Sequence, residues 1–169
     1  MALPRKLKNM NLFNDGISYV GEVSEVTLPT LERQMEEWRG GGMNAPIQTD
    51  HGMSALSMEW TCGGLMEDAL KQWGITTHSG VLLRFAGAYQ RDDRADIDAV
   101  EVTCRGRHSK IDMGTAKAGD NTEFKVTSEL SYYKLELNGE TLIEIDVINM
   151  IENVDGEDRL ADQRTALGI

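Results

Sequence analysis

Residues 123–150 read EFKVTSELSYYKLELNGETLIEIDVINM, and this stretch decides the fold. From Phe124 onward, apolar or aromatic side chains alternate with polar ones, which is the pattern of a β-strand with one buried face. Asn138-Gly139 then supplies two residues that tolerate positive φ, as a tight type I′ turn requires. A second strand follows through Ile145. The stretch therefore predicts a long β-hairpin.

The alternation changes phase at Tyr132-Tyr133. Before this pair the apolar side chains fall on even-numbered positions, and after it they fall on odd-numbered ones such as Leu135 and Leu137. An unbroken pleat would turn half of the strand's hydrophobic side chains into water. Two solutions are open: a β-bulge at the tyrosine pair, or a passage of the strand from one packing partner to another.

The composition suits a single β-rich domain, which we expect to span residues 1–169. The chain is long enough to bury a substantial core, and its 17 glycines against 3 prolines suit many tight turns. No run of about 18 apolar residues occurs and the N-terminus lacks the apolar core of a signal peptide, so we expect a cytoplasmic chain without membrane contact. Cys62 and Cys104 are predicted to be reduced and buried.

The net charge of −11 is unevenly distributed along the chain. It argues against a protein that binds nucleic acid tightly, because affinity for phosphate comes mainly from Lys and Arg. Arg5, Lys6 and Lys8 make the first residues basic, whereas acidic residues dominate the range 140–162. Ends of opposite sign suit a head-to-tail assembly, and the alternative is that both are solvated surface.

The remaining strands and helices follow from shorter patterns. Asp15-Gly16 between two apolar runs predicts a hairpin near the N-terminus. Pro29 cannot donate to a neighbouring strand, so it marks an edge or a bulge. Further strands are predicted over 22–37, 54–62, 81–89 and 99–107. A helix is predicted over 65–73, ended by Gly74, and its apolar stripe, from Leu65 to Trp73, is expected to cover the open end of a sheet. A short helix is predicted over 155–169, capped by Asp155 or Gly156 and ended by Gly168.

Three further stretches are predicted to be loops. Residues 39–53 contain three consecutive glycines, but no Lys-Ser/Thr pair follows them as in a phosphate-binding loop, and their apolar residues favour packing against another subunit. The aspartates of 91–98 lack the closing Glu and the mid-loop Gly of an EF-hand, which favours a solvated hairpin tip over a calcium site. Residues 108–122 are predicted to be a surface loop.

The sequence does not indicate a catalytic or metal site. His51, His78 and His108 each lie in a predicted loop, and none is spaced like a metal-binding pair. Nucleophile-elbow, Cys-x-x-Cys and Walker sequences do not occur. Catalytic groups assemble in space rather than in sequence, so this lowers the expectation of an enzyme without excluding one. We expect no catalytic residues, no metal and no cofactor.

Several short segments, in order along almost the whole chain, resemble one known family. They are residues 4–8 (PRKLK), 11–13, 15–16, 26–29 (VTLP), 39–46 (RGGGMNAP), 56–60 (LSMEW), 84–93 (RFAGAYQRDD), 105–107, 132–135, 144–146, 149–151 and 167–169. On these segments the chain resembles the major tail tube proteins of contractile-tailed bacteriophages, a family shared with the tube subunits of R-type pyocins. Trp38 stands where the family commonly has tyrosine, and Cys62 and Cys104 lie outside the family pattern.

The resemblance implies an antiparallel β-sandwich or barrel-like subunit with one flanking helix and a short C-terminal helix. It implies that six copies close into a ring, that rings stack into a hollow tube inside a contractile sheath, and that DNA passes through the lumen to the host without specific binding. The implied partners are other copies of the chain and the sheath, tape-measure, baseplate and tail terminator proteins. The implied location is the virion tail, assembled in the host cytoplasm.

The sites implied by this resemblance are surfaces. A lumen that presents carboxylates repels DNA phosphates at short range. The residues expected to face it are Glu32, Glu36, Glu59 and Glu101, with an outer, sheath-facing position as the alternative. Ring stacking and subunit contacts are expected to use the basic arm (residues 1–10) through Arg5, Lys6 and Lys8, and the glycine-rich loop through Arg39, Gly40, Gly41, Gly42, Met43, Asn44 and Ala45.

Three other functions stay open. The tube subunit of a pyocin-like or type VI secretion machine shares the fold, and the segments quoted above favour the phage or pyocin form. A monomeric β-sandwich binding module would display an exposed aromatic platform, whereas Trp38, Trp60 and Trp73 are expected to pack in the core or at interfaces. A hydrolase on a β scaffold would keep its activity as a strict monomer.

Overall fold

The long hairpin forms as its sequence predicts. In the computed structural model, which describes residues 2–169, strand β9 runs Phe124–Leu137 and strand β10 runs Glu140–Asp146. Between them, Asn138 and Gly139 have φ angles of 52° and 83°, as a type I′ turn requires.

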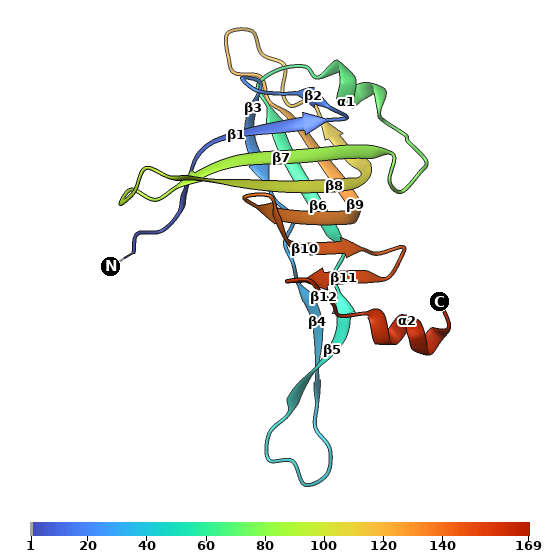
Figure 1. Ribbon diagram of the computed structural model, residues 1–169. Helices are drawn as coiled ribbons and strands as arrows, with labels where there is room; N and C mark the ends of the chain where they lie inside the picture. Colours follow the sequence, from blue (N-terminus) through green and yellow to red (C-terminus); the bar gives the residue numbers. More distant parts are fainter. Residues whose placement is uncertain (1) are drawn as a thin grey trace.

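The hairpin belongs to a large antiparallel sheet (Figure 1). Within residues 2–169 this sheet has ten strands, with β12-β11-β10-β9-β8-β7-β1-β2 in one row and with β6 and β3 branching from β9. The other strands are β1 (Lys6–Asn14), β2 (Ile17–Ser18), β3 (Val23–Thr27), β6 (Leu56–Cys62), β7 (Val81–Gln90), β8 (Ile97–Asp112), β11 (Ile151–Val154) and β12 (Glu157–Asp158). This arrangement confirms the mainly β fold class.

Strand β9 changes both its phase and its pairing partner beside the tyrosine pair. On β8 the neighbours Arg105 and Gly106 face Tyr132 and Leu130, which leaves Ser131 as the extra residue of a bulge. On its other edge β9 pairs with β6 before the bulge and with β10 after it. The two solutions that the sequence left open therefore occur together, one residue before the predicted position.

The sheet branches at β9, where β6 and β10 pair with different parts of the strand, and its strands bend around one hydrophobic core. Figure 1 shows β6 crossing β7 and β8 at a steep angle. The chain between β2 and β3 folds back onto this core, because the Tyr19 amide donates to the Leu12 carbonyl (2.8 Å) and the centroid of the Tyr19 ring lies 5.5 Å from that of the Trp60 ring. Buried core residues include Leu12, Met58, Trp60, Val81, Leu83, Phe85, Val102, Cys104, Phe124 and Val126.

Several shorter predictions are confirmed. The N-terminal hairpin turns at Asp15 and Gly16, whose φ angles are 47° and 85°. The strands predicted over 54–62, 81–89 and 99–107 are β6, β7 and β8, and residues 91–96 form the tip between β7 and β8. Cys62 and Cys104 are buried, free thiols, and burial raises their pKa values to about 11 and about 12.

The prediction of one extended segment over residues 22–37 is wrong. β3 ends at Thr27, and after a break that contains Pro29, β4 (Arg33–Trp38) begins a separate two-stranded sheet with β5 (Ile47–Met53). The predicted loop over residues 39–53 is likewise wrong from Ile47 onward. The sequence pattern does not predict β5, because residues 47–52 are exposed on both faces of the strand and polar and apolar residues therefore do not alternate.

Both helices are shorter than predicted. α1 comprises only Glu67–Lys71, and α2 comprises Ala161–Leu167. The α1 turn is followed by Gly74 with a φ of 81°, and α2 ends at Gly168 with a φ of 75°, as expected. Asp155 and Gly156 do not cap α2, since they form the turn between β11 and β12.

Strand β8 continues through Asp112, so the loop predicted over 108–122 is wrong for residues 108–112 and confirmed from residue 113 onward. The loop placement of His51 is also wrong, because His51 lies in β5. His108 belongs to a buried polar network that ties α1 to the sheet. Gln72, at the end of α1, accepts from Asn14 (2.8 Å) and lies 2.9 Å from His108 Nε2, while His108 Nδ1 lies 2.9 Å from Ser128 Oγ. Buried polar groups need such partners, so the network fixes the position of α1.

We expect His108 to make the stability of the subunit depend on pH. Burial lowers its pKa from 6.5 to about 4. Between these values the unfolded chain binds a proton that the folded subunit does not, so stability falls as the pH drops from about 6.5 to about 4, by at most about 3 kcal/mol. Urea unfolding at pH 7.0 and about pH 4.5 should show a smaller loss in His108→Gln than in the wild type. Equal losses in both proteins would contradict this role, because the carboxylates titrate alike in both.

Candidate assembly surfaces

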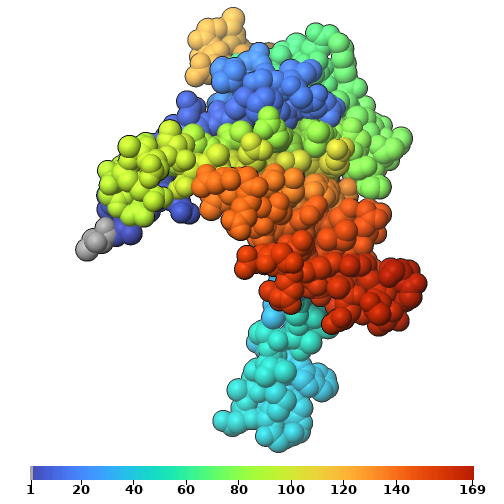
Figure 2. Space-filling view, in the orientation of Figure 1, coloured from blue at the N-terminus to red at the C-terminus, as the bar shows by residue number. Residues whose placement is uncertain are grey.

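The β4–β5 hairpin projects from the body (Figure 2). It exposes large hydrophobic side chains. No residue of β4 is buried, and Met35, Trp38 and Ile47 are 48%, 61% and 54% exposed. An isolated two-stranded hairpin is at best marginally stable in water, and exposed apolar surface of this kind marks interaction sites. The hairpin is therefore suited to pack against a neighbouring molecule.

The glycine-rich tip, residues 39–46, closes on itself around Met43. The Met43 amide donates to the Gly40 carbonyl (3.3 Å), and Arg39 Nε donates to the Met43 carbonyl (3.1 Å). Gly42 has a φ of 82°, a conformation that residues with a Cβ rarely adopt. These contacts give the tip a defined shape with one charged residue, the exposed Arg39.

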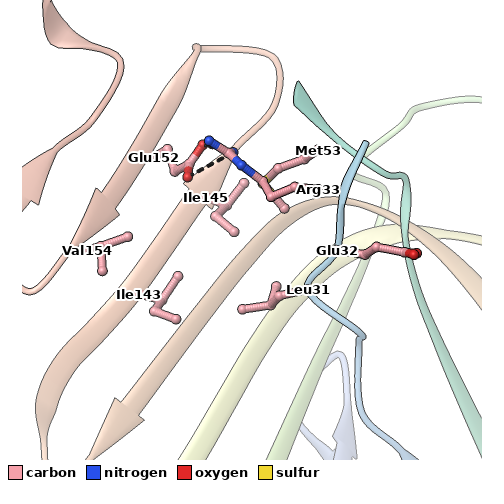
Figure 3. Close-up of a pocket in the computed structure, with 8 residues that line it drawn as sticks. All are labelled: Leu31, Glu32, Arg33, Met53, Ile143, Ile145, Glu152 and Val154. Carbon is pink, nitrogen blue, oxygen red and sulfur yellow. Dashed lines mark hydrogen bonds and ion pairs between the residues drawn. The ribbon is translucent and has the colours of Figure 1, made fainter. Parts of the chain in front are cut away.

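One arginine joins the root of the hairpin to the body. Arg33 Nε pairs with Asp50 Oδ2 across the hairpin (2.8 Å), and Arg33 Nη1 pairs with both oxygens of Glu152 in β11 (3.0 and 3.1 Å; Figure 3). A hydrogen bond from the Gly52 amide, and then the pair with Arg33, lower the pKa of Asp50. The clamp is charged at neutral pH and sets the hairpin against β11.

A small apolar hollow of about 110 Å³ lies beneath this root. Figure 3 shows side chains from the hairpin side and from β10 and β11 facing each other across it. The apolar residues that line it are Leu31, Met53, Ile143, Ile145 and Val154. Because the root is incompletely packed, the direction of the hairpin depends on the Arg33 clamp as well as on these apolar contacts.

Replacing Arg33 by glutamine should loosen the hairpin with little effect on the body. Arg33 is half exposed, so the clamp contributes less than about 1 kcal/mol to global stability. If this stabilisation is lost from the hairpin alone, the hairpin opens more often, and tryptic cleavage after Arg39 should become up to roughly fivefold faster. Lys71→Gln removes an exposed ion pair on α1 and should leave that rate unchanged. Equal cleavage of Arg33→Gln and the wild type would show that the clamp does not hold the hairpin.

The N-terminal arm lies along the tip of the β7–β8 hairpin. Arg5 Nε pairs with Asp98 Oδ2 (2.8 Å), and Lys8 Nζ pairs with Asp92 Oδ1 (2.5 Å). A hydrogen bond from Asn138, and then the charge of Arg5, lower the pKa of Asp98. Two of the three basic residues of the arm that were expected at subunit contacts are thus paired within the subunit, and the third, Lys6, is exposed.

The four glutamates expected to face a lumen do not gather at one place. Glu59 lies on β6 and Glu101 on β8, both on the side of the sheet that faces away from the core. Glu59 accepts from Thr127 Oγ1 (3.3 Å), and Glu101 pairs with Arg84 (3.3 Å). Glu32 and Glu36 are exposed on the β4–β5 hairpin and its root.

A second exposed apolar surface was missed by the sequence analysis. Leu65 and Trp73, predicted to form part of a packed helical stripe, are 69% and 58% exposed, since α1 is too short for its ends to face the core. Trp73 lines a hollow of about 210 Å³ with three further apolar residues, Leu70, Ile111 and Met113. We call Leu65 and these four residues the α1 patch.

Among residues 2–169, no group of three or more His, Cys, Asp or Glu side chains is arranged to hold a metal ion. In the same part of the chain, no helix has the length and apolar character needed to cross a membrane.

Comparison with known proteins finds relatives over the whole chain. Residues 4–168 match the family described as phage tail tube protein FII. The tail tube protein of Escherichia phage P2 is 47% identical over 100% of both chains. Two solved structures share the fold at low identity. The sheath/tube terminator structure of an extracellular contractile injection system has a TM-score of 0.60 and 8% identity, and the match covers 79% of this chain and 96% of that one. The six-fold symmetrised baseplate of the anti-feeding prophage has a TM-score of 0.54 and 12% identity, and the match covers 80% of this chain and 97% of that one.

Proposed function

Because this chain belongs to the phage tail tube protein FII family and is a tube subunit of a contractile phage tail, we propose that six copies of it close into a ring and that such rings stack into a hollow tube. The observation that carries the proposal is the β4–β5 hairpin, which exposes Met35, Trp38 and Ile47 and has no core of its own. A neighbouring subunit in the stack would cover these side chains. The six-fold symmetry of the anti-feeding prophage baseplate supports the ring size.

Ring closure would use the open edges of the main sheet. The row ends in β2 on one side and β12 on the other, and edge strands offer unpaired backbone groups to a neighbouring chain. The acidic residues of 140–162 lie toward the β12 edge, whereas the basic arm runs into β1 at the other. Since Arg5 and Lys8 are already paired within the subunit, backbone pairing rather than charge would supply most of the closure.

DNA would pass through the lumen without binding to it. A wall of carboxylates repels phosphates over a distance of about 8 to 10 Å before salt screens the charges. We assign this wall to the exposed face of the sheet that carries Glu59 and Glu101, and we place Glu32 and Glu36 where successive rings meet.

The subunit would act together with structural proteins and without chemistry of its own. Contractile injection systems with this fold have a sheath, a tube terminator and a baseplate, and we propose the same three partners here, with a tape-measure protein that sets the length. Assembly would take place in the host cytoplasm. The alternative is the tube of a pyocin-like or type VI secretion particle, which the fold also serves.

Light scattering on the purified subunit, followed by negative-stain microscopy, tests the proposal. Rings or hollow rods of uniform width are expected, either from the subunit alone or when its own baseplate is added. A monomer that stays monomeric at high concentration and also fails to assemble on its baseplate would overturn the tube and favour a monomeric binding module.

A further inference from the structure

Two of the exposed apolar surfaces lie at opposite ends of the subunit. Figure 1 places the tip of the β4–β5 hairpin at one end of the molecule and α1, with the loop of residues 113–123, at the other. Trp38 and Ile47 flank the hairpin tip, and the α1 patch surrounds a hollow of about 210 Å³. Ring stacking would bury the hairpin surface, whereas the contacts proposed above leave the α1 patch exposed.

Stacking of identical rings in one direction relates these two ends. In a head-to-tail stack each contact joins one surface of a subunit to a different surface of the next, so the part that projects from one end must meet the opposite end of its neighbour. The hairpin cannot reach the α1 patch of its own subunit, because the whole body lies between them (Figure 1). An exposed tryptophan on each side also fits the composition of interface hot spots.

Charge supports the same pairing. The tip, residues 39–46, carries a single charged side chain, Arg39, which is exposed. The first turn of α1, beside the patch, carries Glu67 and Asp68, and Lys71 balances only one of them through its pair with Glu67 (2.7 Å). Glu36 and Glu37 precede Trp38 on β4, so the positive charge is confined to the tip itself, where Arg39 would meet the acidic first turn of α1.

We propose that the α1 patch is the acceptor for the hairpin tip of a second copy of this chain in the adjacent ring. The proposal rests on the tube function proposed above and adds its acceptor residues. Trp38 and Ile47 would pack against Trp73 and Met113 across the ring boundary, and Arg39 would face Asp68.

Cysteine crosslinking in assembled rods tests this contact. Ala45→Cys at the tip is combined, in separate proteins, with Leu65→Cys, Trp73→Cys or Met113→Cys, all at exposed positions, and the rods are treated with a short bismaleimide. Cys62 and Cys104 are buried and do not compete. The control combines Ala45→Cys with Leu167→Cys, which is as exposed but lies on α2, away from the patch. A ladder of covalent multimers is expected for at least one patch position and not for the control.

The outcomes separate this contact from the tube itself. Rods that form normally but give no ladder at any of the three patch positions, or give one only with Leu167→Cys, would overturn the acceptor and leave the tube standing. Wild-type protein that forms no rods with its baseplate would overturn the tube and the acceptor together. As a second measurement, Trp73→Asp should raise the subunit concentration needed for rod growth at least about tenfold, whereas an unchanged concentration would count against the acceptor.

Discussion

Replacing Gly106 by alanine is expected to cost the folded subunit at least about 3 kcal/mol of unfolding free energy. A Cβ at this position would lie 2.0 Å from the Glu129 carbonyl oxygen and 3.0 Å from the Leu130 Cα. Both are backbone atoms, which cannot change rotamer to relieve the clash as a flexible side chain could. Gly106 faces the bulge at Ser131, where β9 changes its partner. Relief of the clash would therefore require the register between β8 and β9 to shift, and a shift of one residue would turn buried side chains outward.

Urea unfolding, followed by tryptophan fluorescence at a subunit concentration too low for assembly, measures this cost. Gly64→Ala is the matched control, because a Cβ there has open space and no positive φ opposes it. It should change the unfolding free energy by less than about 0.5 kcal/mol. If Gly106→Ala were as stable as this control, the close approach of β8 and β9 at the bulge would be incorrect.

Replacing Trp38 by aspartate is expected to block tube growth and leave the subunit folded. The side chain is 61% exposed, so its loss should change monomer stability by less than about 0.5 kcal/mol. In the stack it would be buried against a neighbour, where truncating a central tryptophan costs about 2 kcal/mol or more and an unpaired carboxylate adds to that cost. The concentration needed for growth should therefore rise at least about thirtyfold.

Light scattering across a concentration series measures this threshold, and thermal unfolding of the monomer checks the fold. Leu167→Asp serves as the control, since it places the same charge at an equally exposed apolar residue on α2. Normal rods from Trp38→Asp at wild-type concentration would contradict the role given to the hairpin. A lower unfolding temperature of its monomer would show instead that Trp38 supports the subunit itself.

Sequence reasoning succeeded where the signal is local. The hairpin of residues 123–150 could be predicted because alternation, the phase change and Asn138-Gly139 all lie within one stretch and agree. The strand β5 could not, since it is exposed on both faces and owes its pairing to β4 alone. The clamp partner Glu152 lies far from Arg33 in the sequence, so no spacing rule joins them.

The same distinction explains the errors around α1 and His108. Spacing alone placed Leu65 and Trp73 in a packed stripe, but whether a short helix buries its ends depends on what lies across from it. His108 was predicted to lie in a loop because its partners, Gln72 and Ser128, come from other elements. The positions of Glu59 and Glu101 relative to a lumen depend on neighbouring subunits, which the pattern of one chain does not contain.

A reconstruction of the assembled rods by electron cryomicroscopy would show what each β4–β5 hairpin contacts. We expect a hollow tube with six-fold symmetry in which every β4–β5 hairpin crosses to the adjacent ring, where Trp38 is buried. Rods with another symmetry, or with the hairpins extended into solvent and Trp38 uncovered, would contradict it.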